Sequence, residues 1–379
     1  MLIVSMPDGI VRKIFHVAFM IAGSVSISDS KPAFGHSIGF VAGGIGDQIY
    51  HLTQLRTLAT AAKDGVIDIA CIHPNPIGQL LANSPWVGKI IDARPLRRYV
   101  PAIRGQAAVD EIRQGGYDTA FFMHRSTSFK IAAMAAGINY RVGLYGHWLD
   151  RAILHRRLDG ASSNRSDVWG HRPFIGAIDD FVAASGLSLD ESTPTILPSK
   201  KALAEADAML APLSGPIIML NLFAVDPMRR WPVSAALASV LHLAEATGGT
   251  FILNAGSDAR TYHQECMAQW QAMTASKNSK IQASLIDSLA HNPSMAKDVA
   301  LYHRADFYIG VDSFTANLAL NCNLPALILF ARESDILRYR SISQPVAAPQ
   351  DGDISSVPTE KIIAAFDKLS KITNVKPTA

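Results

Sequence analysis

Residues 37–62, SIGFVAGGIGDQIYHLTQLRTLATAA, decide the fold. The apolar run at 38–42 predicts a buried strand, and residues 47–62 carry apolar side chains at helical spacing. A glycine-rich turn joins the two segments. Strand, tight turn and helix in this order form the first half of a βαβ unit, so the stretch predicts a parallel sheet covered by helices.

The same alternation continues along the chain and then restarts. A first block has strand patterns at 67–72, 89–91 and 119–123 and helix patterns at 76–82, 129–136 and 171–185. After a Ser-, Thr- and Pro-rich linker at 192–199, a second block has strand patterns at 217–222, 250–254, 307–311 and 326–330 and helix patterns at 233–247 and 315–322. Two such blocks predict an α/β protein with two Rossmann-like, doubly wound domains that face a central cleft.

The predicted boundaries follow from this pattern. We expect one domain at 37–190, a second at 200–350 and a final helix within 357–372. That helix carries an apolar stripe, Ile362, Ile363, Phe366 and Leu369, which needs a surface to cover. Residues 1–36 form an N-terminal extension of unknown role, because their apolar run at 14–27 is short for a membrane span and lacks a clear small-residue cleavage site.

Composition narrows the class of protein. The chain has 379 residues, 49% of them hydrophobic, which fits two domains with large cores. A formal net charge of +3 gives no global reason to expect a nucleic-acid partner. Its 3 cysteines are far apart, so they predict neither a disulfide framework nor a zinc knuckle. We therefore expect a cytoplasmic protein, with peripheral attachment at the inner face of the cell membrane as one alternative.

The first candidate site is the turn Gly43-Gly44-Ile45-Gly46-Asp47. Its glycines let the backbone approach a ligand, and the amino terminus of the following helix favours negative charge. A dinucleotide-binding turn would need glycine instead of Ile49 and would not place a carboxylate beside a pyrophosphate. Asp47 is instead suited to take a proton from an acceptor hydroxyl, although it could simply favour the helix start.

Two further candidate sites follow strands of the second block. Arg229 and Arg230 precede a helix, where paired guanidiniums suit a diphosphate leaving group without a metal, or line a solvated turn. Asp312, Ser313 and Thr315 come after the 307–311 strand, where they could bind sugar or phosphate groups or cap the next helix. Asn221 and Gly256 end neighbouring strands of the same block and are expected to border the same ligand.

At these strand ends the sequence resembles the heptosyltransferase-type glycosyltransferases, glycosyltransferase family 9. The order of the motifs carries the resemblance more than any one of them. The matching residues are Gly46 and Asp47, YDTAF at 117–121, His171 and Arg172, RRWP at 229–232, Gly256, VDS at 311–313 and LPA at 324–326.

The resemblance implies a GT-B architecture and inverting, metal-independent transfer from a nucleotide-sugar. The first domain would bind the acceptor, a glycan or glycolipid of surface-glycan or lipopolysaccharide type. The second domain would bind the donor, and no cofactor would be needed. The roles implied are Asp47 as general base, Arg229 and Arg230 on the donor diphosphate, and Asp312 with the amides that follow it at the donor sugar and phosphates. The final helix would pack back across both domains.

The remaining assignments come from position. Gly44, Gly46, His124 and Arg125 are expected on the acceptor side, and Asn221, Gly256, Asp312, Ser313, Phe314 and Thr315 on the donor side. The family commonly has Lys at one of the two arginine positions and a glycine-rich turn with His where this chain has residues 314–317, so the sugar stays open, heptose being one candidate.

Other charged groups have two interpretations. Arg94, Arg97, Arg98 and Arg104, with a second group at Arg151, Arg156 and Arg157, could hold an anionic glycan or an anionic membrane surface, or form a solvated face. Asp351 and Asp353 have D-x-D spacing without a preceding strand, and the histidines are not spaced as ligands, so no metal site is predicted. Besides the transferase, a sugar-nucleotide-binding scaffold without activity and an NAD(P)-dependent oxidoreductase stay open.

Overall fold

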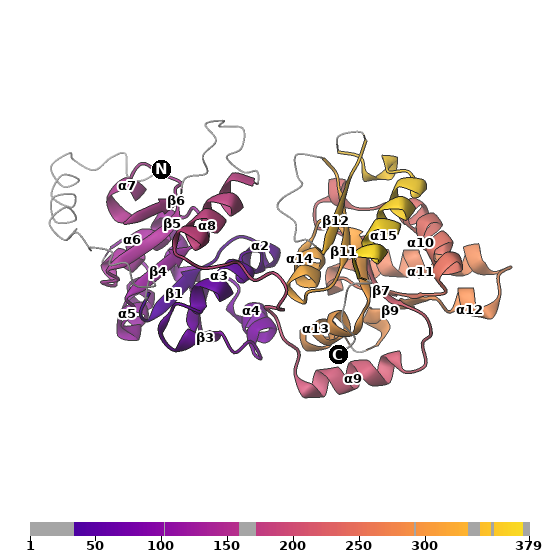
Figure 1. The fold of residues 1–379 in the computed structure, drawn as a ribbon, viewed down its shortest axis with the longest axis horizontal. Coiled ribbons are helices and arrows are strands. Elements are labelled where there is room, and N and C mark those ends of the chain that lie inside the picture. Colours follow the sequence, from indigo (N-terminus) through magenta and orange to yellow (C-terminus); the bar gives the residue numbers. More distant parts are fainter. Residues whose placement is uncertain are drawn as a thin grey trace.

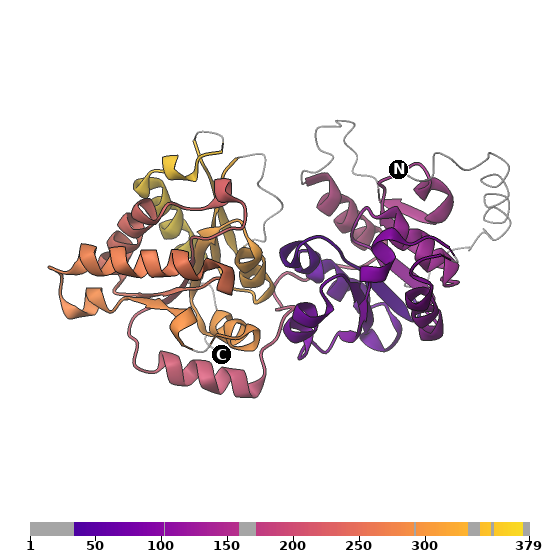
Figure 2. The ribbon, with the colours of Figure 1, turned by 180° about the vertical axis from the view of Figure 1, so that it is seen from behind.

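The computed structural model describes residues 34–101, 103–158, 172–291, 293–332, 342–349 and 352–373. Within these ranges the chain forms two domains, each built on a six-stranded sheet with helices around it (Figure 1, Figure 2). All strand pairs in both sheets are parallel. His171, Asp351 and most of the N-terminal extension lie outside the described residues.

The first sheet has the strand order β3-β2-β1-β4-β5-β6. Its order reverses between β1 and β4, where α/β proteins of this type bind ligands at the carboxyl ends of the strands. The strands are β1 (Ser37–Phe40), β2 (Ile67–Cys71), β3 (Val87–Asp92), β4 (Thr119–Phe122), β5 (Tyr140–Leu144) and β6 (Arg156–Leu158). The helices are α2 (Ile45–Ile49), α3 (Leu52–Ala59), α4 (Pro74–Leu81), α5 (Gln106–Gly115), α6 (Thr127–Ala135), α7 (Asp150–Ile153) and α8 (Arg172–Ala184).

The second sheet repeats this topology with the order β12-β11-β10-β7-β8-β9, so its switch point lies between β7 and β10. Its strands are β7 (Ile217–Asn221), β8 (Thr250–Leu253), β9 (Leu285–Asp287), β10 (Phe307–Val311), β11 (Ala326–Phe330) and β12 (Ser343–Ala347). Its helices are α9 (Lys200–Leu210), α10 (Val233–Thr247), α11 (Arg260–Thr274), α12 (Ser279–Gln282), α13 (Met295–Arg304) and α14 (Phe314–Asn321). The predicted α/β class with two Rossmann-like domains is confirmed.

The helix expected at 47–62 is two helices. The chain leaves helical geometry at His51, with φ −99° and ψ 14°, so α2 and α3 are separate elements. The break lets the two helices pack in different places. Helix α2 contacts α14 of the second domain, whereas α3 contacts α8 and β2.

The expectation that the final helix packs across both domains is wrong. This helix, α15 (Thr359–Thr373), packs on the second domain. Its contacts are with β11, β12 and α10, all in the second domain (Figure 1). Ile362, Phe366 and Leu369 are buried in that domain's core, where the rings of Phe366 and Phe307 lie 5.0 Å apart between centroids. The apolar stripe of α15 therefore covers part of the second domain.

An apolar core continues across the domain boundary. One cluster of buried residues combines Ile49 and Leu80 of the first domain with Val299 and Leu318 of the second. The helix pairs that meet there are α2 with α14 and α4 with α13. The two carboxyl edges at β1 and β10 are therefore brought together by packing. Among the described residues, every helix falls short of what a membrane span requires.

Candidate functional site

Asp47 projects from the first turn of α2, at the carboxyl end of β1. Its Oδ2 accepts a hydrogen bond of 2.8 Å from the Gly44 amide, while the side chain stays exposed. Gly43 has φ +98°, and a Cβ there would lie 2.5 Å from Asp47 Oδ2, so this glycine makes room for the carboxylate. Among the described residues, Asp47 Oδ1 has no hydrogen bond, which leaves one oxygen for an incoming hydroxyl.

The charge of Asp47 acts on His124, and His124 in turn lies near a second histidine, His51. Nδ1 of His124 accepts a hydrogen bond of 3.1 Å from the Ser126 amide, so the neutral ring carries its proton on Nε2. Burial lowers the pKa of His124, with Asp47 opposing the shift. Burial and the neighbouring His124 lower the pKa of His51 to about 4. Both rings are therefore uncharged at neutral pH. His124 is half-buried and can orient a bound molecule by a hydrogen bond rather than by charge, whereas His51 is buried.

A buried ion pair fixes the loops that follow β4 and β5. Nζ of Lys130 lies 2.6 Å from Oδ2 of Asp150, and neither side chain has exposed surface. Lys130 also donates to the carbonyls of Leu144, at 2.7 Å, and Arg125, at 3.3 Å. The amide of Gly146 donates to Asp150 at 2.8 Å. The backbone carrying His124 and Arg125 is thus held by a charged group from inside the domain.

Arg229 and Arg230 have different partners. Nη1 of Arg229 donates to Oδ2 of Asp312 at 3.2 Å, and its side chain is 46% exposed. Arg230 instead donates to the carbonyls of Ala224, at 2.8 Å, and Val225, at 3.3 Å. Its guanidinium also lies 4.6 Å from the ring centroid of Phe223. Arg230 therefore organises its own loop, and Arg229 is the guanidinium presented at the domain boundary.

The hydroxyls of Ser313 and Thr315 are used inside the protein. Nδ2 of the buried Asn221 donates to Ser313 Oγ at 2.9 Å and to Thr315 Oγ1 at 2.6 Å. Thr315 Oγ1 also lies 3.1 Å from the hydroxyl of Tyr308. This network ties the end of β7 to the start of α14. It shapes the turn that carries Asp312, and it engages both hydroxyls inside the protein.

Gly256 lies at the carboxyl end of β8, beside β7 in the sheet. A Cβ at this position would lie 2.6 Å from Oδ1 of Asp258. Nearby, Nδ2 of Asn254 donates to Asp298 at 2.9 Å, and burial raises the pKa of Asp298 to about 6. Gly256 is thus exposed on the same sheet edge as Asn221 and Asp312.

Gly46 lies where α2 of the first domain contacts α14 of the second. A Cβ on Gly46 would lie 3.3 Å from both the Phe314 Cα and the Asn317 side chain across the boundary. The glycine therefore permits close approach of α2 and α14, a reason different from the expected approach of a ligand. Asp47 is next to Gly46 in α2, and Asp312 comes just before α14, so both carboxylates flank one junction.

Comparison with solved structures identifies the architecture. The chain matches the Escherichia coli ADP-heptose lipopolysaccharide heptosyltransferase II with TM-score 0.65 and 17% identity, covering 90% of this chain and 100% of that one. It matches the family 9 glycosyl transferase of Veillonella parvula with TM-score 0.68 and 14% identity, covering 89% and 98%. For the Escherichia coli heptosyltransferase WaaC with ADP-2-deoxy-2-fluoro heptose these values are 0.61 and 14%, covering 88% and 99%. This chain has the GT-B fold of the heptosyltransferases.

No protein-family model and no curated protein matches the sequence. At these identities the likeness establishes the GT-B fold, as the strand-end motifs predicted. The fold places the sequence-predicted residues on two carboxyl edges, with Gly44, Asp47, His124 and Arg125 on the first and Asn221, Arg229, Gly256 and Asp312 on the second.

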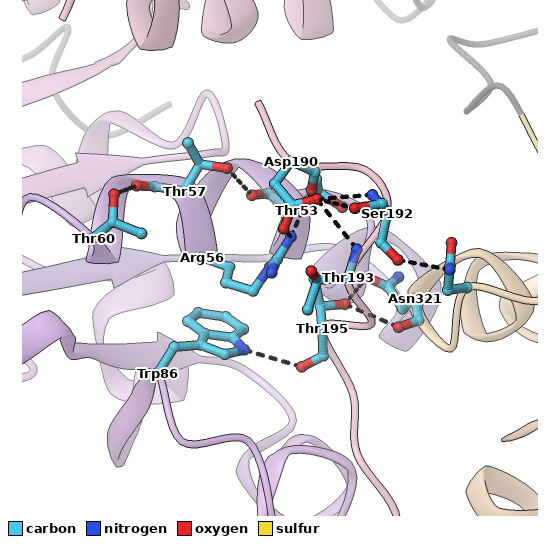
Figure 3. Close-up of polar contacts among 11 residues, drawn as sticks. Thr53, Arg56, Thr57, Thr60, Trp86, Asp190, Ser192, Thr193, Thr195 and Asn321 are labelled. Atoms are coloured by element: carbon cyan, nitrogen blue, oxygen red, sulfur yellow. Dashed lines mark hydrogen bonds and ion pairs between the residues drawn. The ribbon is translucent and has the colours of Figure 1, made fainter. Parts of the chain in front are cut away.

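Sequence reasoning missed the residues that hold the two halves of this GT-B fold in position. The interdomain linker is fixed to the first domain by Arg56, which pairs with Asp190 at 3.0 Å, and by Trp86 Nε1, which donates to the Thr195 carbonyl at 3.0 Å (Figure 3). The Thr195 amide donates to the Asn321 carbonyl at 2.8 Å. Nδ2 of the buried Asn321 donates to the Ile49 carbonyl of α2 at 3.0 Å. Such long-range contacts have no local sequence pattern.

Proposed function

We propose that this protein is an inverting, metal-independent glycosyltransferase that moves a sugar from a nucleotide-sugar to a hydroxyl of a surface-glycan or lipopolysaccharide-type acceptor. One observation carries the proposal. The packing of α2 on α14 sets an exposed carboxylate, Asp47, and an exposed guanidinium, Arg229, on facing sheet edges. These are the two charges that such a transfer needs.

The reaction assigns each charge a role. Asp47 accepts the proton of the acceptor hydroxyl as its oxygen attacks the anomeric carbon of the donor sugar. The bond from that carbon to the phosphate oxygen breaks, and the electron pair leaves with the nucleoside diphosphate. Attack from the face opposite the leaving group inverts the anomeric centre. Arg229 stabilises the charge that develops on the diphosphate, with Asp312 holding the guanidinium in place.

The solved structures suggest which donor to test first. The Escherichia coli heptosyltransferase WaaC has been solved with ADP-2-deoxy-2-fluoro heptose and, in a second structure, with ADP. We therefore propose an ADP-sugar as the first donor candidate. The turn at residues 314–317 differs from the usual family pattern, and Phe314 there is partly buried against the core, so a sugar other than heptose is compatible with the same diphosphate contacts.

One observation favours a second function. Both sheets have the strand order of dinucleotide-binding domains, which suits an NAD(P)-dependent oxidoreductase. The β1–α2 turn opposes it, because Asp47 takes the Gly44 amide at 2.8 Å and places negative charge where a pyrophosphate would bind. A scaffold that binds a sugar nucleotide without transferring the sugar is the other alternative, and it shares the second-domain contacts.

The two adjacent arginines provide a matched test. We would measure thermal shifts of the purified protein with ADP-, GDP-, UDP-, CMP- and dTDP-sugars and NAD(P), with EDTA present, and then sugar transfer to extracted glycolipid. Arg229→Ala should remove the shift caused by the donor and lower transfer at least 100-fold, in line with about 3 kcal/mol of charge stabilisation in the transition state. Arg230→Ala should lower the unfolding temperature of the unliganded protein and keep a donor-induced shift.

The outcomes separate the alternatives. Binding of one sugar nucleotide with no transfer would favour the scaffold, and binding of NAD(P) alone would favour the oxidoreductase. Loss of transfer on addition of EDTA would contradict metal independence. Equal loss in both arginine variants would contradict the different roles assigned to them.

A further inference from the structure

The loop after β3 combines unpaired positive charge with exposed apolar side chains. A 3₁₀ helix at Arg94–Arg98 leads into a tight turn, in which Val100 and Arg104 form an isolated antiparallel bridge. Ile103 on this turn is 78% exposed and Val100 is 39% exposed. These two apolar side chains are therefore available to an apolar partner.

The turn is anchored to the core of the first domain. Leu96 is fully buried and Tyr99 is 6% exposed, so both side chains enter the core of the first domain. Gly105 closes the turn at φ +82°, and a Cβ there would lie 2.8 Å from the Pro95 carbonyl. The apolar side chains of Val100 and Ile103 are thus presented by a segment that is fixed to the domain.

Three arginines of this segment are available to bind an anionic partner. Arg97, Arg98 and Arg104 are exposed and form no ion pair among the described residues. Arg94 is different, because it donates from Nε and Nη2 to both oxygens of Asp92. In the following helix, α5, Asp110 pairs with Arg113. The segment that exposes Ile103 therefore carries three arginines without an ion pair among the described residues.

We propose that this basic turn, made of Arg97, Arg98, Val100, Ile103 and Arg104, docks the protein onto an anionic phospholipid bilayer. Arginines beside such a surface gain favourable electrostatic energy from the lipid head groups, and an exposed isoleucine enters the interface between head groups and acyl chains. A soluble polyanion would satisfy the arginines without using the apolar side chains. Because the turn exposes arginines together with apolar side chains, an anionic bilayer fits it better than a soluble polyanion does.

The position of the turn gives this docking an orientation, which rests on the proposed function. The turn follows β3, so it lies at the same carboxyl edge of the sheet as Asp47. The 3₁₀ helix packs against α5 and α6, which Figure 1 shows on the side of the first domain away from the second. The charge of Arg97 also contributes to lowering the pKa of His124, which places it near the acceptor side. A docked protein would present that side to a lipid-linked acceptor.

Vesicle co-sedimentation of the full chain tests the docking. The vesicles would contain phosphatidylcholine alone or phosphatidylcholine with phosphatidylglycerol. We expect binding to the anionic vesicles only, weakened by salt. Arg97→Ala with Arg98→Ala should lower partitioning about 25-fold, about fivefold for each charge. Ile103→Ser should lower it about fivefold, equivalent to one or two methylene groups withdrawn from the interface.

The control is Val225→Ser. Val225 is 80% exposed but belongs to the second domain, so partitioning should not change. Thermal unfolding confirms that each variant folds. Equal binding to neutral and anionic vesicles, no binding to either, or an equal loss in Val225→Ser would overturn the proposal. Sugar transfer is measured separately, so a protein that transfers sugar in solution but ignores vesicles refutes docking alone, and the converse result refutes the proposed function alone.

Discussion

The buried ion pair of Lys130 and Asp150 should stabilise the loops after β4 and β5 by an amount that can be calculated. Asp150→Ala leaves the Lys130 ammonium without its counter-charge in a site with 0% exposure. It also removes the acceptor of the Gly146 and His147 amides and of the Thr127 hydroxyl. Breaking a buried ion pair costs about 3–5 kcal/mol, and the three additional lost bonds place this variant at the upper end. For a domain of roughly 150 residues the melting temperature should fall by about 8–20 °C.

Urea and thermal unfolding at several pH values give the measurement. Burial lowers the pKa of Lys130, so in Asp150→Ala the folded state binds fewer protons than the unfolded state, and stability should rise as pH increases toward the ordinary lysine pKa. Lys130→Met combined with Asp150→Asn removes both charges and keeps an oxygen for the amides, and it should recover most of the loss. If Asp150→Ala costs less than about 1 kcal/mol, the reasoning from burial is refuted.

Two more predictions concern residues that sequence reasoning did not identify. Asn321→Ala removes the bond from α14 to the Ile49 carbonyl and should lower the turnover number at least tenfold (about 1.4 kcal/mol) with unchanged donor affinity, measured by steady-state kinetics and titration with the donor; an equal loss of donor affinity would contradict it. The pKa of His51, about 4 in the folded protein, predicts that about 3 kcal/mol of stability is lost as pH falls from 6.5 to 4, because the unfolded chain takes up the proton first. His51→Phe should flatten this dependence in urea unfolding, and an unchanged slope would assign it to other groups.

The sequence predicted every inner strand except β5, and among the four edge strands it predicted only β3. Strands at 307–311 and 326–330 were predicted at the observed bounds of β10 and β11, because an inner parallel strand is buried on both faces and reads as a continuous apolar run. The edge strands β6, RRL at Arg156–Leu158, and β12, with Pro345 inside Ser343–Ala347, have no such run. They pair with β5 and β11, the strands that precede them in the chain, without the apolar run that would mark them in the sequence.

The candidate site shows the same limit at the level of single side chains. Arg229 and Arg230 are indistinguishable as neighbouring letters. Their roles diverge only because Asp312, 83 residues away, accepts from Arg229, whereas Arg230 turns back to its own loop. Lys130, by contrast, left a signal, since a lone lysine in the small, apolar helix segment Thr127–Ala135 needs a buried partner.

The distance between the two domains depends on Gly46, because a glycine has no side chain to hold the helices apart. Gly46 allows α2 to approach Phe314 so closely that an added Cβ would be at 3.3 Å, and the bond from Asn321 to Ile49 fixes the same two helices one turn further on. Because Asn321 also receives the Thr195 hydroxyl and amide of the linker, movement of the linker is coupled to this contact (Figure 3). Neither Gly46 nor Asn321 needs to touch a substrate to affect transfer. In the proposed reaction, Gly46 and Asn321 set the separation between Asp47 and Arg229, so they would determine whether proton removal and diphosphate stabilisation act on one bound pair of substrates.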